Sequence, residues 1–511
     1  MIINNIKLKI GESEKKLKKI AEEKLRGECR YLQILKKSLD ARNKSDIRWV
    51  YSIRAEKQDV RREKKSFPEA KQNKKNIAII GSGPAGLFCA LRLIDHGFCP
   101  VIIERGGNVE ERAIQNEKFF KEHKLDENTN VQFGEGGAGT FSDGKLNTQT
   151  HTPLNIDVLE IFAGFGAPPE ILYLAKPHIG SDNLKKVIVR MREYILANGG
   201  KIYFHSRFED IKIKEGKVQE IGVKDLLSGQ INTFQCDALV LAIGHSSRDT
   251  FELLLRKGFA MEQREFALGV RIEHIQEKIN CAQYSAWHNL LPPADYKLVS
   301  HAGERSCFTF CMCPGGVVIP SASERKGVVT NGMSNYARNE KNSNSALLVQ
   351  VPRSDFDRGN VLDGVEFQRR FEQAAFAMAG NNYSAPVQRI EDFFVGRESG
   401  RFGEVLPTYA AGTAMCDLNK LYPETITSSL KLAISDMGRK LCGFDDPDAL
   451  LTAPETRFSS PVRVLRDASF ESVAVKGVYP CGEGCGYSGG IMSSAADGLR
   501  VAEKIFEKYA D

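Results

Sequence analysis

Residues 76–107 constrain the fold of this chain most, because a glycine-rich turn lies there between two apolar strands. The run Ile77–Ile80 predicts a strand that is buried on both faces, and Gly81, Gly83 and Gly86 follow it as G-x-G-x-x-G. The first glycine permits a tight turn, the second lets the backbone approach a pyrophosphate, and the third allows close helix–strand packing. The stretch therefore predicts a Rossmann-type unit that binds an adenine dinucleotide.

An acidic residue strengthens this prediction. A second apolar run, residues 101–103, ends at Glu104, about 20 residues beyond the turn. A carboxylate there is placed to accept both hydroxyls of an adenosine ribose, and it would repel a 2′-phosphate. The alternative is a glycine-rich turn followed by a solvated surface glutamate, but strand, turn, helix, strand and acid all occur in the expected order.

The length of the chain and the distribution of its cysteines limit the class of protein to which it can belong. The 511 residues predict two or three domains with an ample core. We find no signal-peptide-like segment and no apolar run long enough to span a bilayer. The twelve cysteines are scattered, several of them in apolar stretches, which is typical of free thiols in a reducing compartment. We therefore expect a cytoplasmic protein with no membrane partner.

The positive charge is concentrated at the N-terminus. Residues 1–75 contain 23 Lys+Arg against 11 Asp+Glu, a net charge of +12, whereas the rest of the chain carries −6. Apolar alternation in residues 6–10 and 47–53, with a lysine-rich helix between them, predicts a small βαβ module, followed by a charged linker at 55–75. The basic module either binds nucleic acid or carries an ordinary solvated face; the second is favoured because no RNA-binding signature is present.

A second glycine-rich stretch occupies residues 131–146, VQFGEGGAGTFSDGKL. Its glycines indicate positive φ angles or close approach to a ligand, and successive N–H groups can form an anion-binding concavity. Lys145 could add a positive charge. The alternative is a flexible surface loop, but a ligand-binding loop is favoured because the stretch follows the dinucleotide turn.

The order of the remaining elements is typical of an FAD domain. A helix near 183–198 precedes a series of short strands, and residues 237–245 form a buried strand that closes on Gly244. Near the C-terminus, a strand and an acidic turn containing Glu483 precede a helix over 491–509, whose N-terminus is expected at the flavin.

We predict an α/β fold with a glutathione-reductase-like, Rossmann-type FAD-binding domain, an inserted mixed α+β substrate or cap domain, and the N-terminal βαβ module. The predicted limits are 1–70 for the module with its linker, 71–261 and 466–511 for the FAD-binding domain, and 262–465 for the insertion.

The motifs together resemble a known family. FGEGGAGTFSDGKL at 133–146, CMCPGG at 311–316, NGMSNYARNEKNSNSALLV at 331–349 and CGEGCGYSGGIMSSAADG at 481–498 are similar to those of an uncharacterised bacterial family of FAD-dependent dehydrogenases, distantly related to glutathione-reductase-type flavoproteins. Glu483 stands where the wider superfamily usually has aspartate. The residues that we expect to bind FAD are Gly81, Gly83, Pro84, Ala85, Gly86, Glu104, Arg105, Arg112, Gly136, Gly137, Ala138, Gly139, Thr140, Lys145, Phe208, Gly244, Gly482, Glu483, Gly490 and Ile491.

The expected activity is that of an FAD-dependent oxidoreductase, which transfers a hydride between flavin N5 and an unassigned small molecule. Only the G-x-G-x-x-G at 81–86 lies in a strand–turn–helix–strand unit that ends in an acidic residue, so NADH or NADPH, if it is the electron donor, has no Rossmann domain of its own. The rival is a binding protein that contains FAD and associates with nucleic acid through residues 1–70. No metal site, catalytic residue or oligomeric state is assigned.

Three groups of polar residues remain open. Cys311, Cys313, Cys481 and Cys485 match no standard redox or metal spacing, and we favour a structural role for them. The isolated histidines receive no catalytic role. A polar cluster either faces a substrate pocket or hydrogen-bonds loops; its residues are Tyr336, Arg338, Asn339, Asn342 and Asn344.

Overall fold

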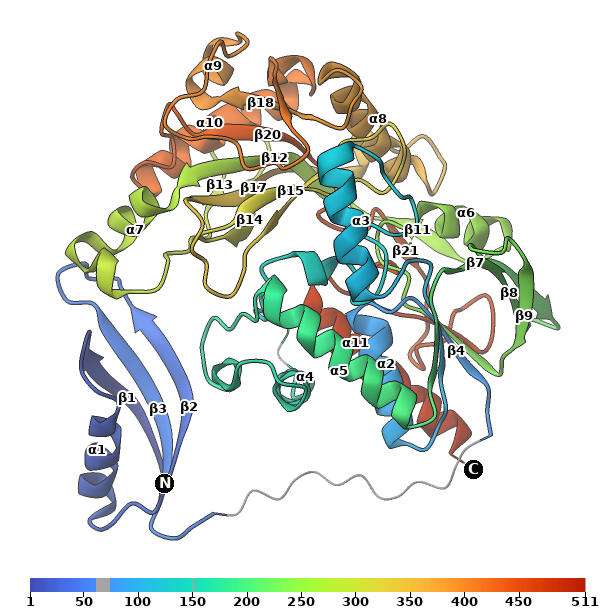
Figure 1. Cartoon of the computed structure of the whole chain (residues 1–511), viewed down its shortest axis with the longest axis horizontal. Helices are drawn as coiled ribbons and strands as arrows, with labels where there is room; N and C mark the ends of the chain where they lie inside the picture. The colour runs from blue at the N-terminus through green and yellow to red at the C-terminus, as the bar shows by residue number, and fades with distance from the viewer. Residues whose placement is uncertain (61–73, 149, 151, 511) are drawn as a thin grey trace.

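The computed structural model describes residues 1–60, 74–148, 150 and 152–510. A five-stranded parallel sheet organises the largest part of the chain (Figure 1), in the order β22-β10-β4-β5-β6. Its strands are β4 (Ile77–Ile80), β5 (Val101–Ile103), β6 (Lys201–Tyr203), β10 (Ala238–Leu241) and β22 (Val478–Pro480). Segments from both ends of the chain thus meet in one sheet.

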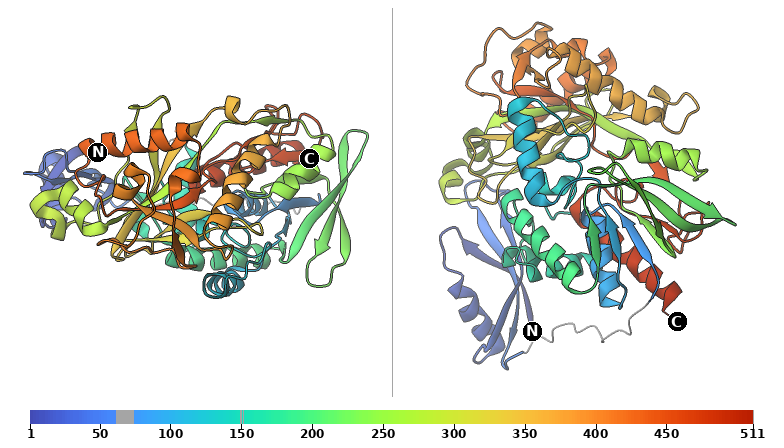
Figure 2. Two further views of the ribbon diagram at one scale, coloured as in Figure 1. Left: turned by 90° about the horizontal axis from the view of Figure 1, so that it is seen from above. Right: turned by 45° about the vertical axis from the view of Figure 1, so that its right-hand side comes forward.

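Helices cover one face of this parallel sheet and a β-ribbon covers the other. The helices are α2 (Pro84–Asp95), α4 (Leu154–Gly164), α5 (Ser181–Ala197) and α11 (Ile491–Tyr509), which share one apolar core with the sheet. Opposite them lie β7 (Ser206–Lys214), β8 (Lys217–Asp225), β9 (Ile231–Gln235) and α6 (Arg248–Arg256). The ribbon of β7–β9 lies at the end of the molecule away from the N-terminus (Figure 2). We call this part the parallel-sheet domain.

A seven-stranded mixed sheet forms the inserted domain, in the order β13-β14-β17-β12-β20-β18-β19. Alternate residues of β12 and β17 pack against α8 and α10 in the largest core of the chain. The elements are β12 (Phe266–Ile275), α7 (Gln276–Tyr284), β13 (Val299–Ser300), β14 (Cys307–Cys313), β15 (Val317–Pro320), β16 (Thr330–Met333), β17 (Asn342–Val351), α8 (Asp363–Met378), β18 (Ala385–Arg389), α9 (Ile390–Val395), β19 (Thr413–Met415), α10 (Glu424–Lys440) and β20 (Leu450–Glu455).

The chain crosses between the two domains at an antiparallel pair, β11 (Met261–Gln263) and β21 (Val462–Val464). The fold class predicted from the sequence, a Rossmann-type α/β domain with an inserted α+β domain, is confirmed. We keep the predicted limits, 71–261 with 466–511 and 262–465, as our proposal for the domains.

The N-terminal module differs from the predicted βαβ unit. Its elements are β1 (Ile2–Lys9), α1 (Lys15–Leu25), β2 (Tyr31–Asp40) and β3 (Arg48–Glu56), so one more strand is present than the apolar pattern indicated. All pairs in its sheet, β1-β3-β2, are antiparallel. Most of the predicted linker, residues 61–73, lies outside the described residues.

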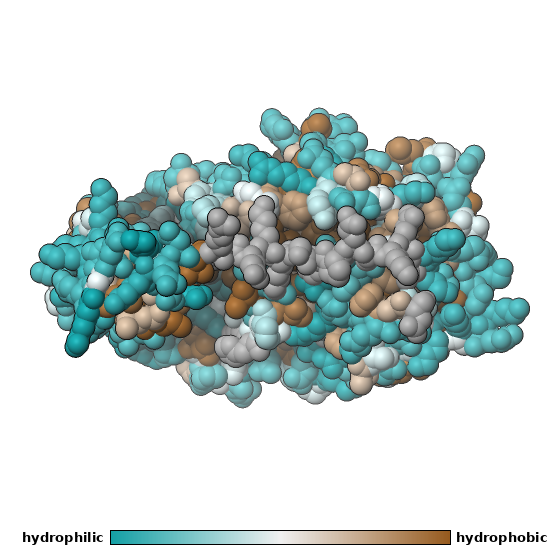
Figure 3. Space-filling model, turned by 90° about the horizontal axis from the view of Figure 1, so that it is seen from below, coloured by the Kyte–Doolittle hydropathy of each residue, from teal (hydrophilic) through white to brown (hydrophobic). Residues whose placement is uncertain are grey.

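The module is attached to the rest of the protein. Ile47 lies in the core of the inserted domain, and the Lys37 backbone exchanges hydrogen bonds with Tyr173 and Ala175. Seen from below, the outer surface of the N-terminal module is largely hydrophilic, and hydrophobic residues lie where the module faces the rest of the protein (Figure 3). Among the described residues, no helix is both long and apolar enough to cross a membrane.

Candidate functional site

One large cavity lies between the parallel-sheet domain and the inserted domain. Its volume is about 960 Å³, near the upper end of the range for ligand sites. The glycine turn after β4, the loop after β10, the acidic turn after β22 and the strand β14 all contribute to its wall. Segments that are hundreds of residues apart therefore share one ligand-sized space.

The three glycines of the turn have different neighbours. A Cβ at Gly81 (φ +100°) would lie 2.4 Å from the carbonyl oxygen of Ala242, and one at Gly86 would lie 2.0 Å from that of Gly81. A Cβ at Gly83, by contrast, would lie no closer than 3.8 Å to its nearest neighbour, the Cα of Gly137, and Gly83 lines the cavity. Gly83 is also the N-cap of α2, and no side chain caps this helix, so its first N–H groups are available to an anion.

Glu104 lines the cavity, but its acceptor positions are already occupied. One oxygen accepts hydrogen bonds from the backbone N–H (2.8 Å) and hydroxyl (2.7 Å) of Ser82, and the other from the N–H groups of Gly106 (2.9 Å) and Gly134 (3.0 Å). Since a carboxylate offers about four acceptor sites, a ribose hydroxyl would have to share or replace one of these donors. Glu104 therefore joins the two glycine-rich loops to each other.

Arg112 holds the second glycine-rich loop in shape. Its buried guanidinium donates to the carbonyl oxygens of Asn130 (3.1 Å), Val131 (3.0 Å), Glu135 (2.5 Å) and Gly137 (3.1 Å). Burial lowers the pKa of Arg112 to about 10.

Fifteen of the twenty predicted residues line the cavity. The other five lie behind its wall, so we assign them to support rather than to direct contact: Gly86, Arg112, Gly136, Thr140 and Gly482.

The C-terminal turn completes the site. A Cβ at Gly482 would lie 2.8 Å from the Cβ of Ala85, so this turn packs directly against the start of α2. Next to it, the carboxyl group of Glu483 lines the cavity and has no hydrogen-bond partner among the described residues, and burial raises its pKa to about 8. The N-terminus of α11 at Gly490 also lacks a capping side chain. Two open helix N-termini and an unpartnered carboxyl group fit a ligand that carries phosphates and hydroxyls, as FAD does.

Comparison with known proteins agrees with this geometry. Residues 75–259 match the family model described as pyridine nucleotide-disulphide oxidoreductase, and residues 265–458 match that described as FAD-dependent protein, C-terminal domain-like. Residues 1–56 match a domain of unknown function. An uncharacterized protein of Clostridium beijerinckii is 44% identical over 531 residues, which cover 99% of this chain and 98% of that protein. The chain belongs to this FAD-dependent family. It is an FAD-dependent oxidoreductase, and FAD is its cofactor.

Solved structures of flavin enzymes are similar at low identity. A flavin-dependent brominase aligns over 85% of this chain and 81% of its own (11% identity, TM-score 0.39). The FrdA chain of E. coli quinol fumarate reductase aligns over 85% of this chain and 70% of its own, with 12% identity and a TM-score of 0.38. A geranylgeranyl bacteriochlorophyll reductase-like protein of Thermoplasma acidophilum aligns over 86% of this chain and 80% of its own, with 12% identity and a TM-score of 0.37.

Sequence reasoning missed the part of the flavoenzyme cavity that the inserted domain supplies. Phe308 and Phe310 of β14 pack edge-to-face on Phe458, with centroid distances of 5.4 and 4.5 Å, and all three line the cavity. Their alternation in β14 indicated a shared face. Which face lies over the cofactor site depends on how the sheet docks, and the sequence carries no signal for that.

The predicted polar cluster of the flavoenzyme hydrogen-bonds loops and strands, and none of its five members lines the cavity. The Arg338 guanidinium donates to Asp143 (3.0 Å), Asn342 donates to Glu273 (3.1 Å), and Asn344 accepts from Arg271 (3.0 Å). Of the two alternatives left open by the sequence, the structural role is therefore the one observed.

Lys145 connects the second glycine-rich loop to the inserted domain of the flavoenzyme. Its ammonium group donates to the carbonyl oxygen of Met312 and lies 3.4 Å from Asp143. Lys145 lines the cavity, and its ammonium group faces the Met312 carbonyl group of β14 and the carboxylate of Asp143.

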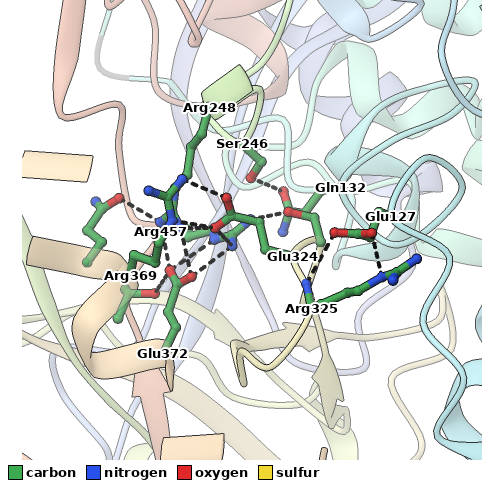
Figure 4. Close-up of polar contacts among 12 residues, drawn as sticks. Glu127, Gln132, Ser246, Arg248, Glu324, Arg325, Arg369, Glu372 and Arg457 are labelled. Atoms are coloured by element: carbon green, nitrogen blue, oxygen red, sulfur yellow. Dashed lines mark hydrogen bonds and ion pairs between the residues drawn. The ribbon is translucent and has the colours of Figure 1, made fainter. Parts of the chain in front are cut away.

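A buried ion network ties the two domains of the flavoenzyme together beside the cavity (Figure 4). The Arg248 guanidinium donates to both oxygens of Glu372 (2.8 and 2.9 Å), and Arg457, which lines the cavity, donates to the same carboxylate (2.9 and 3.1 Å). His245, also on the cavity wall, lies 2.9 Å from the Ser246 hydroxyl. Burial, together with Arg457 and Arg248, lowers the pKa of His245 to about 3, so its imidazole is neutral at physiological pH.

Proposed function

We propose that this flavoenzyme transfers a hydride between its cofactor and a small organic molecule, and that NADH or NADPH serves as the electron donor. The observation that supports this most is the shared cavity, because residues of the dinucleotide turn and residues of β14 line one space. A compound that rests against β14 can thereby reach the same site as the cofactor.

The chain offers specific groups to FAD. The open N-terminus of α2 beside Gly83 would hold the pyrophosphate, the Glu483 carboxyl group would bond a hydroxyl, and the N-terminus of α11 would stabilise negative charge on the ring system. When bound, FAD supplies hydride exchange at its N5 atom. We keep as a proposal that Glu104 contacts the ribose by exchanging its bond to the Ser82 hydroxyl.

The inserted domain offers an apolar surface to the substrate. Phe308, Phe310 and Phe458 would exclude water and stack on a flat or apolar part of the molecule. The exposed Lys176, paired with Asp295 at 2.7 Å, marks where the cavity reaches solvent. A small molecule with an apolar portion fits these walls best.

The nucleic-acid alternative gains no support. The match at residues 1–56 is to a domain of unknown function, and the Lys37 ammonium of the module pairs with Glu14 at 2.6 Å. The basic surface therefore keeps its simpler interpretation as a solvated face.

Anaerobic mixing of the purified holoenzyme with NADH or NADPH tests the proposal. We expect bleaching of the flavin absorbance, slowed when the transferred hydrogen of the nicotinamide is deuterium. Phe310→Ala should slow reduction by the nicotinamide but not reduction by dithionite. Phe394→Ala, whose side chain is equally exposed at 38% but lies far away on α9, should slow neither reaction. Bleaching by dithionite alone, with both nicotinamides inert, would contradict the donor assignment.

A further inference from the structure

A β-bulge in β14 brings two cysteines together at the cofactor cavity. Phe310 pairs with Ala346 and Cys313 with Asn344, so one extra residue is inserted in β14, and Cys311 adopts φ +45° there. A bulge of this kind redirects side chains. Cys311 lines the cavity, and the Cys313 sulfur lies 3.3 Å from the Cys311 carbonyl oxygen.

Two buried cations hold the backbone of this bulge. The Arg271 guanidinium, fully buried on β12, donates to the carbonyl oxygen of Cys311 (3.1 Å) and forms an ion pair with Glu455 (2.6 Å). The Lys145 ammonium donates to the carbonyl of the next residue, Met312. Asp143 and Glu455 are the acidic groups that face these cations.

The charges favour the thiolate of Cys311. The interaction with the Cys313 side chain lowers the pKa of Cys311 most, and the positive charges of Lys145 and Arg271 lower it further against burial and Asp143, to about 6. The pKa of Cys313 is raised well above the usual value by its thiol partner and by burial. The two pKa values shift in opposite directions, so Cys311 loses its proton before Cys313, as a nucleophile and its resolving partner require.

No other described cysteine has these surroundings. Burial raises the pKa values of the Cys89, Cys236, Cys307, Cys481 and Cys485 thiols. Cys481 also lines the cavity, but no cation donates to its backbone. The sequence-based preference for a structural role therefore suits Cys481 and Cys485 better than it suits Cys311.

We propose that Cys311 and Cys313 form a redox-active dithiol that reduces a small disulfide entering the cavity beside Phe310. This names the substrate class of the site and rests on the proposed function for its supply of electrons, because a nicotinamide, through the holoenzyme, must return the pair to the dithiol form.

The reaction consists of two successive thiol–disulfide exchanges, and its electrons and protons balance. The Cys311 thiolate attacks one sulfur of the substrate, the substrate S–S bond breaks, and the first product leaves as a thiolate that takes up a proton. The Cys313 sulfur, losing its proton, then attacks the Cys311 sulfur, and the second product leaves as a thiol. The substrate gains two electrons and two protons, and the two cysteines, oxidised by two electrons, form a disulfide.

Thiol titration of the holoenzyme tests the pair without flavin turnover. Cys281→Ser and Cys442→Ser remove the two exposed thiols as background. We expect dithiodipyridine at pH 7 to release two thiopyridones per reagent molecule consumed at the pair, and peptide mapping to find Cys311 linked to Cys313. In Cys313→Ser the reaction should stop after one thiopyridone, with the reagent bound to Cys311. Lys145→Met should slow the first step about tenfold, because a higher pKa leaves less thiolate.

Three results are decisive. An unmodified Cys311 in protein that keeps its flavin spectrum would overturn the proposal, and so would separate mixed disulfides on Cys311 and Cys313. If the pair closes but neither NADH nor NADPH reopens it, the thiol pair stands and the proposed electron donor is wrong.

Discussion

The Cα of Gly482 faces the side chain of Ala85 so closely that an added Cβ would lie 2.8 Å from the Cβ of Ala85. These residues are almost 400 positions apart in the sequence, one after β22 and the other in the first turn of α2. The contact packs together the two turns that we assign to FAD. The site therefore depends on both ends of the chain at once.

Gly482→Ala should destabilise the holoenzyme and release flavin. Gly482 has φ +74°, which costs an alanine about 1–2 kcal/mol, and the clash with Ala85 should add about 1–3 kcal/mol. Gly396→Ala is a matched control, because Gly396 has φ +70° and no neighbour within 4 Å. Urea unfolding monitored by flavin fluorescence measures both variants; equal losses would show that the packing contact is unimportant.

Glu104→Ala should weaken FAD binding by roughly 10- to 150-fold, the loss expected for charge-assisted bonds of about 1.5–3 kcal/mol. It should also destabilise the fold by about 3 kcal/mol, because buried N–H groups of Ser82, Gly106 and Gly134 lose their acceptor. Ser82→Ala removes only the hydroxyl bond and frees an acceptor site for the ribose, so flavin affinity should stay unchanged or rise. Equilibrium dialysis gives the affinities. A weaker flavin complex in Ser82→Ala would argue against a ribose contact at Glu104.

Glu483→Gln should remove a pH dependence from the stability of the flavin-free protein. The pKa of Glu483 rises from 4.5 to about 8 on burial, so the folded state holds this proton more tightly than the unfolded state does. The contribution of this group to stability is complete below pH 4.5 and is lost as the pH rises towards 8, by at most about tenfold in the unfolding equilibrium per pH unit. Melting curves of wild type and Glu483→Gln from pH 5 to 9 should converge at low pH and separate, with the variant more stable, at high pH. Parallel curves would refute the assignment.

Glu372→Gln should loosen the contact between the two domains. Burial alone would raise the pKa of Glu372, but Arg248 and Arg457 outweigh it and hold the pKa well below its usual range. Removing this charge leaves the buried guanidinium groups of Arg248 and Arg457 to share the charge of Glu324, at a cost of about 3–5 kcal/mol. The ionised Glu372 carboxylate stabilises the folded protein fully above pH 4.5, and this contribution is lost as the pH falls further. The variant should therefore differ least from wild type in acid. Glu366→Gln, 60% exposed on the same helix, should cost less than about 0.5 kcal/mol in the same chemical denaturation.

Local patterns were enough to predict the dinucleotide-binding half of the fold. The apolar run ending at Gly81 is β4, and the helix expected at 491–509 has those limits as α11, because period and glycine signals coincide there. The predicted helix near 183–198 also occurs, as α5. Gly83 and Glu483 line the cavity, and the sequence indicated their positions because each belongs to a glycine-rich motif that directly follows the end of a strand.

Long-range packing decided what the sequence could not. The aromatic wall of Phe308, Phe310 and Phe458 depends on how the inserted sheet docks over the parallel sheet, and no local pattern encodes that arrangement. Strand β2 was missed because its side chains are half-buried on both faces and do not alternate. Arg112 was expected at the ligand; its charge instead satisfies buried carbonyl groups, which only the loop conformation reveals.

Hydrogen exchange with and without FAD tests most directly whether both ends of the chain hold one cofactor. Binding should protect the amides of residues 81–86 and of residues 482–494 over the same range of FAD concentration, while α1 of the N-terminal module stays unchanged. Protection of the first segment alone, with the C-terminal turn exchanging as fast as before, would contradict the account.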